Sequence, residues 1–285
     1  MIIDFHAHLE FKTLDQTYTA TEFVAGMNRG GIDKTVLLGN DQGDAGSCPP
    51  WRDSRFMAVP TNWSDEEVAA FCATNPDRLL GLTSIHPDRY RPERKIRRAI
   101  QEFGLKGVKL YPHSGFYAND ARLDRVYDLC TQLGVPVVIH TGPKAVRWQW
   151  LKYDNPIHVD DVATNFPDLR IVMCHGGYPW VEQFIVTAYS NPNVWVDLTF
   201  MDYIEQTFRV PGLVENTVGR LVDLIGPQRL LWGSEGPYMN LPLFGQHEPD
   251  YYARSQDYLV RRFGFLSDDD KADILGRNAA RLLGL

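Results

Sequence analysis

The chain has 285 residues, 44% of them hydrophobic and 23% charged, which is an ordinary composition for a globular protein. Its 29 basic residues against 36 acidic ones give a net charge of −7, which argues against nucleic acid or an anionic membrane surface as a partner. No apolar run approaches membrane-spanning length, no leader segment opens the chain, and the four cysteines form no CxxC pair, so we expect reduced thiols and a cytoplasmic location.

Short apolar and β-branched runs recur along the chain, each bounded by turn residues, and they predict strands. These eight runs lie at residues 2–5, 34–38, 79–85, 107–110, 136–139, 169–174, 194–198 and 229–233. Helical periodicity appears between them, most clearly at residues 65–74, 92–103, 122–133 and 210–225. The final stretch, residues 267–283, also has a helical pattern.

The alternation of strands and helices predicts the fold class. Several of the strands are apolar throughout, as expected for parallel strands that helices cover. Eight strand–helix units favour an α/β protein, a closed (β/α)8 TIM barrel that forms a single domain over residues 1–285. The alternative is a doubly wound open sheet, but no glycine-rich phosphate loop follows the first strand.

Four long connections follow the carboxyl ends of predicted strands. They are residues 39–62, 141–155, 199–211 and 235–249. In a TIM barrel this is the face where the active site forms. Connections of this length usually serve as pocket walls or lids.

Histidines collect at the predicted strand ends. His6 and His8 point the same way, because side chains on a strand alternate with a period of two. The others at or just beyond a strand end are His86, His113, His140 and His175. An isolated His-x-His pair is equally compatible with polar residues at a turn. Nitrogen ligands gathered at one rim, however, are typical of a divalent transition-metal site.

The eighth predicted strand ends at Glu235, which places a carboxylate at the same rim. Beside a metal, such a carboxylate can be a ligand, a proton acceptor or both. Asp197, within the seventh strand, is an alternative acid. Cys174 has the opposite strand parity from His175, so we expect it to face the helices.

The chain resembles the amidohydrolase superfamily at His6-Ala7-His8, at residues 136–142 (PVVIHTG) and at residues 172–177 (VMCHGG). It is most similar to the amidohydrolase-related branch, which also contains non-oxidative decarboxylases and lactone hydrolases. Residues 106–110, 231–234 and 274–282 extend the resemblance over the whole chain.

The resemblance implies a barrel with one divalent metal ion, with zinc as the first expectation and manganese or cobalt as alternatives. The implied metal ligands are His6, His8, His140 and Glu235. Glu235 would also be the general base, and His175 would polarise substrate or water. One position departs from the family, which usually has aspartate where this chain has Glu235. The extra methylene moves the carboxylate by roughly 1.5 Å.

We expect five further residues to contact substrate: Lys109, His86, His113, Arg55 and Arg147. Strand parity points Lys109 into the barrel mouth, where it pairs with a substrate carboxylate or a buried acid. Some superfamily members instead carry a carboxylated lysine after strand four that bridges two metals. The two histidines are equally compatible with hydrogen-bonded rim positions. Arginines near Trp51, Phe56, Trp148 and Trp150 suit a planar or carboxylate-bearing substrate.

The first functional hypothesis is a metal-dependent hydrolase of a small carboxylated cyclic ester or amide. Water activated by the metal would attack the carbonyl, Glu235 would take its proton, and His175 would stabilise the oxyanion. The alternative is a metal-dependent non-oxidative decarboxylase of an aromatic or enol-type acid, a carboxy-lyase. A non-catalytic binding protein has no need of four converging imidazoles. The expected partner is a small anionic substrate, and analogy alone is compatible with a homodimer.

Overall fold

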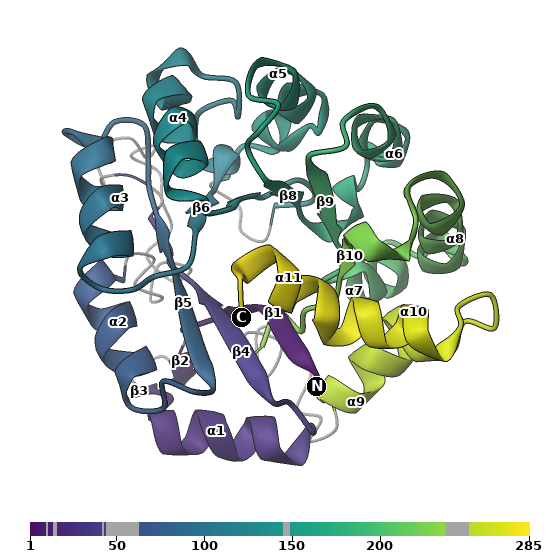
Figure 1. Cartoon of the computed structure of the whole chain (residues 1–285). Helices are drawn as coiled ribbons and strands as arrows, with labels where there is room; N and C mark the ends of the chain where they lie inside the picture. The colour runs from purple at the N-terminus through teal and green to yellow at the C-terminus, as the bar shows by residue number, and fades with distance from the viewer. Residues whose placement is uncertain (10, 14–15, 42, 44–62, 145–148, 237–250) are drawn as a thin grey trace.

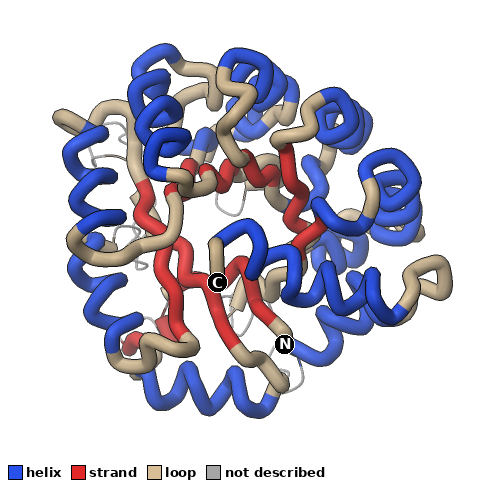
Figure 2. The backbone as a smooth tube through the Cα atoms, viewed as in Figure 1, coloured by secondary structure: helices blue, strands red, loops and turns tan. Residues whose placement is uncertain are grey.

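A computed structural model describes the chain except for residues 10, 14–15, 42, 44–62, 145–148 and 237–250. Eight parallel strands form a ring, and helices surround it (Figure 2). The strands are β1 Ile3–His8, β4 Lys34–Leu38, β5 Leu79–Ser84, β6 Val108–Leu110, β7 Val137–Ile139, β8 Ile171–Met173, β9 Val194–Asp197 and β10 Leu230–Leu231. Each pairs with the next in this order, and a separate antiparallel pair consists of β2 Phe11–Thr13 and β3 Gln16–Thr17.

The ring closes between β1 and the segment that follows β10. The amide of Phe5 donates to the carbonyl of Trp232 at 3.1 Å, and the amide of Glu235 donates to the carbonyl of His6 at 2.8 Å. A parallel bridge joins Ala7 to the same segment. The predicted TIM barrel is therefore confirmed, and the doubly wound open sheet is excluded.

The helices follow the strands around the outside of the barrel (Figure 1). In the described part of the chain they are α1 Ala20–Arg29, α2 Asp65–Ala73, α3 Pro92–Gln101, α4 Asp124–Leu133, α5 Ile157–Asn165, α6 Val181–Ser190, α7 Met201–Thr207, α8 Leu213–Ile225, α9 Tyr251–Gln256, α10 Asp268–Ala272 and α11 Asn278–Leu283. The helices predicted between the strands are confirmed as α2, α3, α4 and α8, and their ends differ by at most three residues. None of the helices described here is both long and apolar enough to cross a membrane.

The connection at residues 199–211 is not the continuous loop that we expected, because it contains α7. Met201 and Ile204 are buried on the inner side of this helix, at 1% and 0% exposure. Their spacing of three residues is helical, but the segment is too short for periodicity alone to distinguish it from a loop. The connection at residues 141–155 contains a shorter element, the 3-10 turn Leu151–Asp154.

Hydrophobic cores lie on both sides of the ring of strands. The larger core fills the space between strands and helices, and the smaller one fills the barrel itself. Ala279 and Leu282 of α11 pack into the inner core, so this helix covers the amino-terminal end of the barrel (Figure 1). Gly276, just before α11, approaches the backbone of Met1 so closely that a Cβ would collide with it. The predicted histidine sites lie at the opposite end.

Cys174 faces the inside of the barrel, so the prediction that it faces the helices was wrong. It packs with Val172 in the inner core, and its Sγ accepts a hydrogen bond from Lys109 Nζ at 3.2 Å. The prediction counted strand alternation back from His175. The strand β8 ends at Met173, however, and His175 has a φ of 63°. The alternation of side chains along the strand therefore does not extend to His175.

Candidate metal centre

Three of the predicted metal ligands lie together at the carboxyl ends of the strands. His6 and His8 belong to β1, and Glu235 follows β10. The Nε2 atom of His6 lies 3.2 Å from Glu235 Oε2, and the Nε2 atom of His8 lies 3.4 Å from Glu235 Oε1. Gly233 permits this approach, because a Cβ at that position would collide with His6. The three side chains form one compact group of candidate ligands.

His175 connects this group to His140. Its ring centroid lies 5.0 Å from that of His6 and 4.6 Å from that of His140. The Nε2 atom of His175 lies 3.1 Å from His140 Nδ1. The structure therefore brings all four histidines of the predicted site and Glu235 into one cluster.

Two of these side chains project from left-handed backbone. His175 has a φ of 63° and Glu235 a φ of 58°, a conformation that residues with a Cβ rarely adopt. It costs of order 1–3 kcal/mol at each position. Gly177, two residues after His175, packs so closely against Phe184 that a Cβ would collide with that side chain. Strain at two predicted functional residues is typical of a site whose geometry serves function.

Asp4 links β1 to the turn that carries Glu235. Its Oδ1 accepts the amide of Ser234 at 2.8 Å, and its Oδ2 accepts the Ser234 hydroxyl at 2.6 Å. Burial raises the pKa of Asp4 to about 7, although the bonds from Ser234 oppose that shift. These bonds tie the strand that carries His6 to the turn that carries Glu235.

Two carboxylates flank the His6 ring. Asp197 of β9 is bonded through Oδ2 to His6 Nδ1, and Glu235 faces His6 Nε2. Burial raises the pKa of both carboxyl groups, but His6 and the other polar neighbours together outweigh this and hold both pKa values below their usual range. The amide of Thr199 also donates to Asp197 Oδ1 at 2.9 Å. Asp197, which we expected only as an alternative acid, thus binds His6 through its carboxylate.

Burial disfavours the charged form of three histidines of the cluster. Burial is the main cause that lowers the pKa of His8, His140 and His175, in the last case to about 3. His175 Nδ1 donates to the carbonyl of Thr199 at 3.0 Å, which leaves its Nε2 as an acceptor. Neutral imidazoles are the form in which histidine binds metals.

The residues present fit a divalent cation. The donor set consists of imidazole nitrogens and a carboxylate, which suits zinc, manganese and cobalt. The ionised side chains of Asp197 and Glu235 bring negative charge into the protein interior, and a divalent ion would neutralise this charge. In the described part of the chain, Glu235 Oε2 and His8 Nδ1 are buried without a hydrogen-bond partner. Such unpartnered polar atoms need a ligand or an ion.

A second group of candidate ligands consists of His113, His140 and Asp154. Asp154 Oδ2 lies 3.3 Å from His113 Nδ1 and 3.9 Å from His140 Nε2. Sequence reasoning missed Asp154, because it ends the 3-10 turn after β7 and belongs to no recognisable motif. Its only sequence signal is its place in a long connection on the carboxyl face.

Lys109 lies inside the barrel, as its strand parity predicted. It is 0% exposed, and its Nζ lies 5.2 Å from the centre of the Tyr111 ring and 3.2 Å from Cys174 Sγ. It forms no ion pair with a carboxylate in the parts of the chain that the structure describes, so the expected buried ion pair is not found there. Its positive charge also acts on His8, where it contributes to lowering the pKa.

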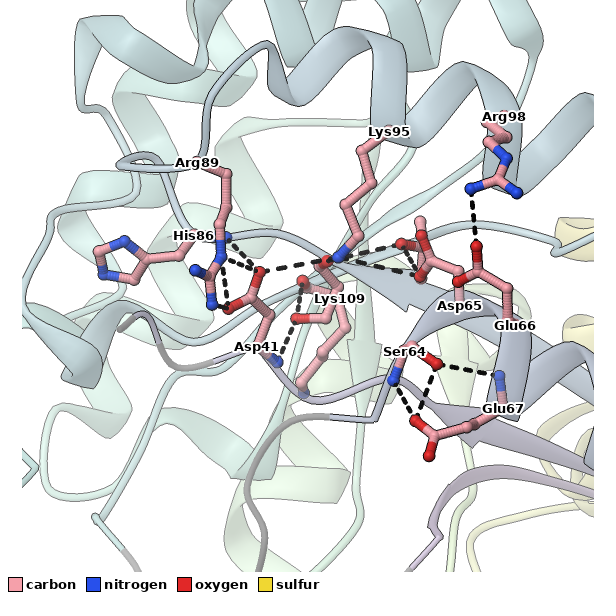
Figure 3. A network of polar contacts seen from close by, with 12 residues as sticks. Asp41, Ser64, Asp65, Glu66, Glu67, His86, Arg89, Lys95, Arg98 and Lys109 are labelled. Atoms are coloured by element: carbon pink, nitrogen blue, oxygen red, sulfur yellow. Dashed lines mark hydrogen bonds and ion pairs between the residues drawn. The ribbon is translucent and has the colours of Figure 1, made fainter. Parts of the chain in front are cut away.

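His86 belongs to the rim beside an ionic network. Its Nδ1 accepts the amide of Asp88 at 3.2 Å, which matches the interpretation of a hydrogen-bonded rim histidine. Its own amide donates to Asp41, and Arg89 binds the same carboxylate at 2.7 Å (Figure 3). Lys95 adds a longer contact of 3.7 Å to Asp41. Burial raises the pKa of Asp41, but Arg89 and Lys95 outweigh this and lower it. This network ties the ends of β4 and β5 together.

The two arginines that we expect to contact substrate lie outside the described residues. Arg55 and Arg147, with Trp51, Phe56 and Trp148, lie outside the described residues. Trp150 is described and is 42% exposed, and its amide donates to the carbonyl of His113 at 2.8 Å.

A family model described as Amidohydrolase matches residues 3–285. The chain belongs to the amidohydrolase family. The resemblance inferred from the motifs is therefore confirmed, and family membership supports an enzyme. The protein fluG of Emericella nidulans is 26% identical over an alignment of 164 residues, which covers 54% of this chain but only 18% of that protein.

Several solved structures share the fold of this chain. An uncharacterized TIM-barrel protein from Bordetella bronchiseptica is 23% identical, with a TM-score of 0.71 and coverage of 99% of this chain and 98% of that one. A probable 2-pyrone-4,6-dicarboxylic acid hydrolase from Acinetobacter baumannii is 15% identical, with a TM-score of 0.70 and coverage of 100% and 99%. A 5-carboxyvanillate decarboxylase from Novosphingobium aromaticivorans is 19% identical, with a TM-score of 0.62 and coverage of 92% and 80%.

Proposed function

We propose that this amidohydrolase is a metal-dependent hydrolase of a small carboxylated cyclic ester or amide. The observation that carries the proposal is the compact group of His6, His8 and Glu235, whose carboxylate is charged and faces both imidazoles. A charged acid beside two imidazoles suits a divalent ion and leaves a base beside it.

The ion would be held by His6, His8, His140 and Glu235. When bound, a divalent ion polarises a carbonyl oxygen and lowers the pKa of a water molecule. We propose zinc as the native ion. Manganese is the alternative, because the similar decarboxylase from Novosphingobium aromaticivorans was solved with bound manganese.

Glu235 is proposed as the general base. Its side chain is 14% exposed, whereas those of Asp197 and His6 are at most 1% exposed, so it is the acid that a substrate can approach. Its lowered pKa keeps it ionised at neutral pH. It therefore accepts the proton of the attacking water as the carbonyl carbon is attacked.

His175 is proposed to accept a hydrogen bond from the attacking water. Its Nδ1–H is committed to the Thr199 carbonyl, and a pKa of about 3 keeps Nε2 unprotonated at neutral pH. An acceptor at Nε2 orients a water molecule but cannot donate to an oxyanion. We therefore favour this role over the oxyanion stabilisation that we first expected.

Lys109 supports an anionic substrate. It is a buried positive charge beneath the cluster, without an acidic partner among the described residues. A carboxylate on the substrate would compensate this charge, which agrees with the expected class of a carboxylated ester or amide. The 2-pyrone-4,6-dicarboxylic acid hydrolase that shares the fold is named for a substrate of this kind.

The second candidate is a non-oxidative decarboxylase of an aromatic or enol-type acid. It rests on the structural similarity to the 5-carboxyvanillate decarboxylase. In this reaction the acid after β10 would deliver a proton to carbon. The lowered pKa of Glu235 disfavours the protonated acid that this step requires, so we place the hydrolase first.

The test combines metal content with products. We expect close to one equivalent of zinc or manganese in the purified protein, lost in the double variant His6→Ala, His8→Ala and retained in the control His158→Ala. A panel of carboxylated lactones, cyclic amides and aromatic acids is then screened in water enriched in oxygen-18. Label in the product supports hydrolysis, and release of carbon dioxide without label supports the decarboxylase instead. Absence of metal from the unmodified protein would contradict both.

A further inference from the structure

The segment that joins β9 to α7 contacts two histidines of the cluster. Asp197 binds His6 through its carboxylate, and the carbonyl of Thr199 accepts a hydrogen bond from His175 Nδ1 at 3.0 Å. The amide of Thr199 in turn donates to Asp197 at 2.9 Å. Phe200 follows directly, so the backbone that orients these two imidazoles also determines where the Phe200 ring lies.

Phe200 itself has left-handed backbone, with a φ of 73° and a ψ of −6°. For a bulky side chain this conformation is a genuine outlier. Such strain persists only where the surrounding structure imposes it, and it gathers at active sites and ligand clamps. Close packing surrounds it here, because a Cβ at Gly176 would collide with Met201, the first residue of α7. Phe200 shares its conformation with His175 and Glu235 of the cluster.

The Phe200 ring lies beside the imidazoles. Its centroid is 5.9 Å from that of the His175 ring, with an angle of 70° between the two planes. Phe200 is 8% exposed, and His8 and His140 are exposed to the same small extent, at 7% and 8%. A part of the Phe200 ring is therefore as open to a ligand as these imidazoles are.

Phe200 belongs to an apolar group outside the two cores of the barrel. It forms a third hydrophobic cluster with Ile204, and Tyr178, Tyr203 and Leu213 pack against this pair. The ring centroids of Phe200 and Tyr203 are 4.6 Å apart, with an angle of 30° between the planes. Binding pockets typically combine such apolar and aromatic walls with a few polar groups that orient the ligand. Phe200 supplies a wall of this kind beside the imidazoles.

We infer that Phe200 is a specificity-determining residue, whose ring packs against the ring of the substrate and favours a planar, conjugated ring over a puckered, saturated one. An offset or edge-to-face pair of aromatic rings strengthens binding roughly 2–10-fold beyond the effect of buried area. A saturated ring has no π-system and cannot form such a pair. The inference rests on the proposed function, because it places the ring of the cyclic ester or amide beside the cluster.

The first test compares two monoanions with the same carbon skeleton, benzoate and cyclohexanecarboxylate, which differ in the planarity of the ring. Their affinities for the zinc-loaded protein are measured by calorimetry. We expect benzoate to bind roughly 2–10-fold more tightly than cyclohexanecarboxylate. Phe200→Leu should remove this preference, and Phe200→Tyr, which keeps an aromatic ring, should retain it. An unchanged preference in Phe200→Leu would overturn the inference, and so would failure of both anions to bind the unmodified protein.

Two control variants separate contact with the ligand from packing. Ile204→Val removes a methylene group from a 0% exposed partner of Phe200, so it should lower the free energy of unfolding without changing the preference. Phe265→Leu changes an exposed aromatic residue between α9 and α10 and should also leave the preference unchanged. Loss of the preference in Ile204→Val to the same extent as in Phe200→Leu would assign Phe200 a packing role only.

A second measurement needs no leucine variant. Intermolecular nuclear Overhauser effects between benzoate and the unmodified protein, with only its phenylalanines labelled, report which rings lie next to the ligand. Phe200→Tyr assigns the Phe200 signals. We expect contacts between the benzoate ring and Phe200, and contacts to other phenylalanines alone would overturn the inference.

Kinetics distinguish this inference from the proposed function. In Phe200→Leu the KM for a carboxylated lactone with a conjugated ring should rise roughly 2–10-fold, and the KM for its saturated counterpart should not change. An equal rise for both lactones would overturn the inference. Absence of oxygen-18 from every product would contradict the proposed function, whereas the two binding measurements would still decide the role of Phe200.

Discussion

His6 is held by Asp197, a residue 191 positions further along the chain. The carboxylate binds His6 Nδ1, and this contact directs the other ring nitrogen, Nε2, toward Glu235. One contact between β1 and β9 therefore sets both the orientation of the ring and the atom that it offers to a metal.

Asp197→Asn tests this contact. The amide keeps the shape of the side chain but removes its charge, so the ring of His6 loses the partner that fixes its tautomer. We expect zinc affinity to fall roughly 10–100-fold, measured by competition with a chelator. Asp161→Asn is the control for removal of an acid elsewhere. Equal affinities in the two variants would contradict the role of Asp197.

Glu235→Gln tests the general base. The change preserves side-chain length and removes the proton acceptor, so turnover should fall by roughly 10²–10⁴-fold on the substrate that the panel identifies. At saturating zinc the variant should still contain metal, because His6 and His8 remain. Unchanged turnover in the metal-loaded variant would exclude Glu235 as the base.

Lys109→Met tests the buried cation. A buried ammonium without an acidic partner among the described residues opposes folding, so the free energy of unfolding should be unchanged or higher in this variant. The KM for an anionic substrate should rise at least about tenfold, because a point charge is lost. Urea unfolding and steady-state kinetics measure the two effects. Lys106→Met, a partly exposed lysine, is the control, and an unchanged KM in Lys109→Met would contradict the proposed contact.

The barrel could be predicted from the sequence because its signals are local. Each strand is a short apolar run, and the histidines follow strand ends directly, so His6, His8, His140 and His175 could be grouped without knowledge of the fold. Alternation failed at Cys174, because left-handed backbone at His175 interrupts it.

The residues behind the histidines could not be predicted in the same way. Asp197 and Asp154 lie beside histidine rings that belong to other elements, and no spacing along the chain relates them to those rings. Their roles depend on distances and on which nitrogen carries a proton, and only the three-dimensional arrangement supplies these.

Asp4→Asn tests the pH dependence of stability. Asp4 has a pKa of about 7 when folded, against an ordinary value of 3.8. The folded protein therefore retains a proton that the unfolded chain releases, so its stabilisation is complete below pH 3.8 and is lost as the pH rises toward 7. In the metal-free protein the free energy of unfolding should fall over this range, with roughly 2–4 kcal/mol coming from Asp4. Urea unfolding at several pH values should show a flatter dependence in Asp4→Asn. An equally steep dependence in the variant would show that Asp4 is not the group responsible.

Metal removal tests whether the cluster also supports the fold. An ion that binds only the folded protein stabilises it by about 4 kcal/mol when its free concentration is 1,000 times the dissociation constant. Dialysis against a chelator should therefore lower the Tm by several degrees, and added zinc should restore it. The double variant His6→Ala, His8→Ala should show neither change, because two of the proposed ligands are missing. A chelator effect of equal size in that variant would place the stabilising ion elsewhere in the molecule.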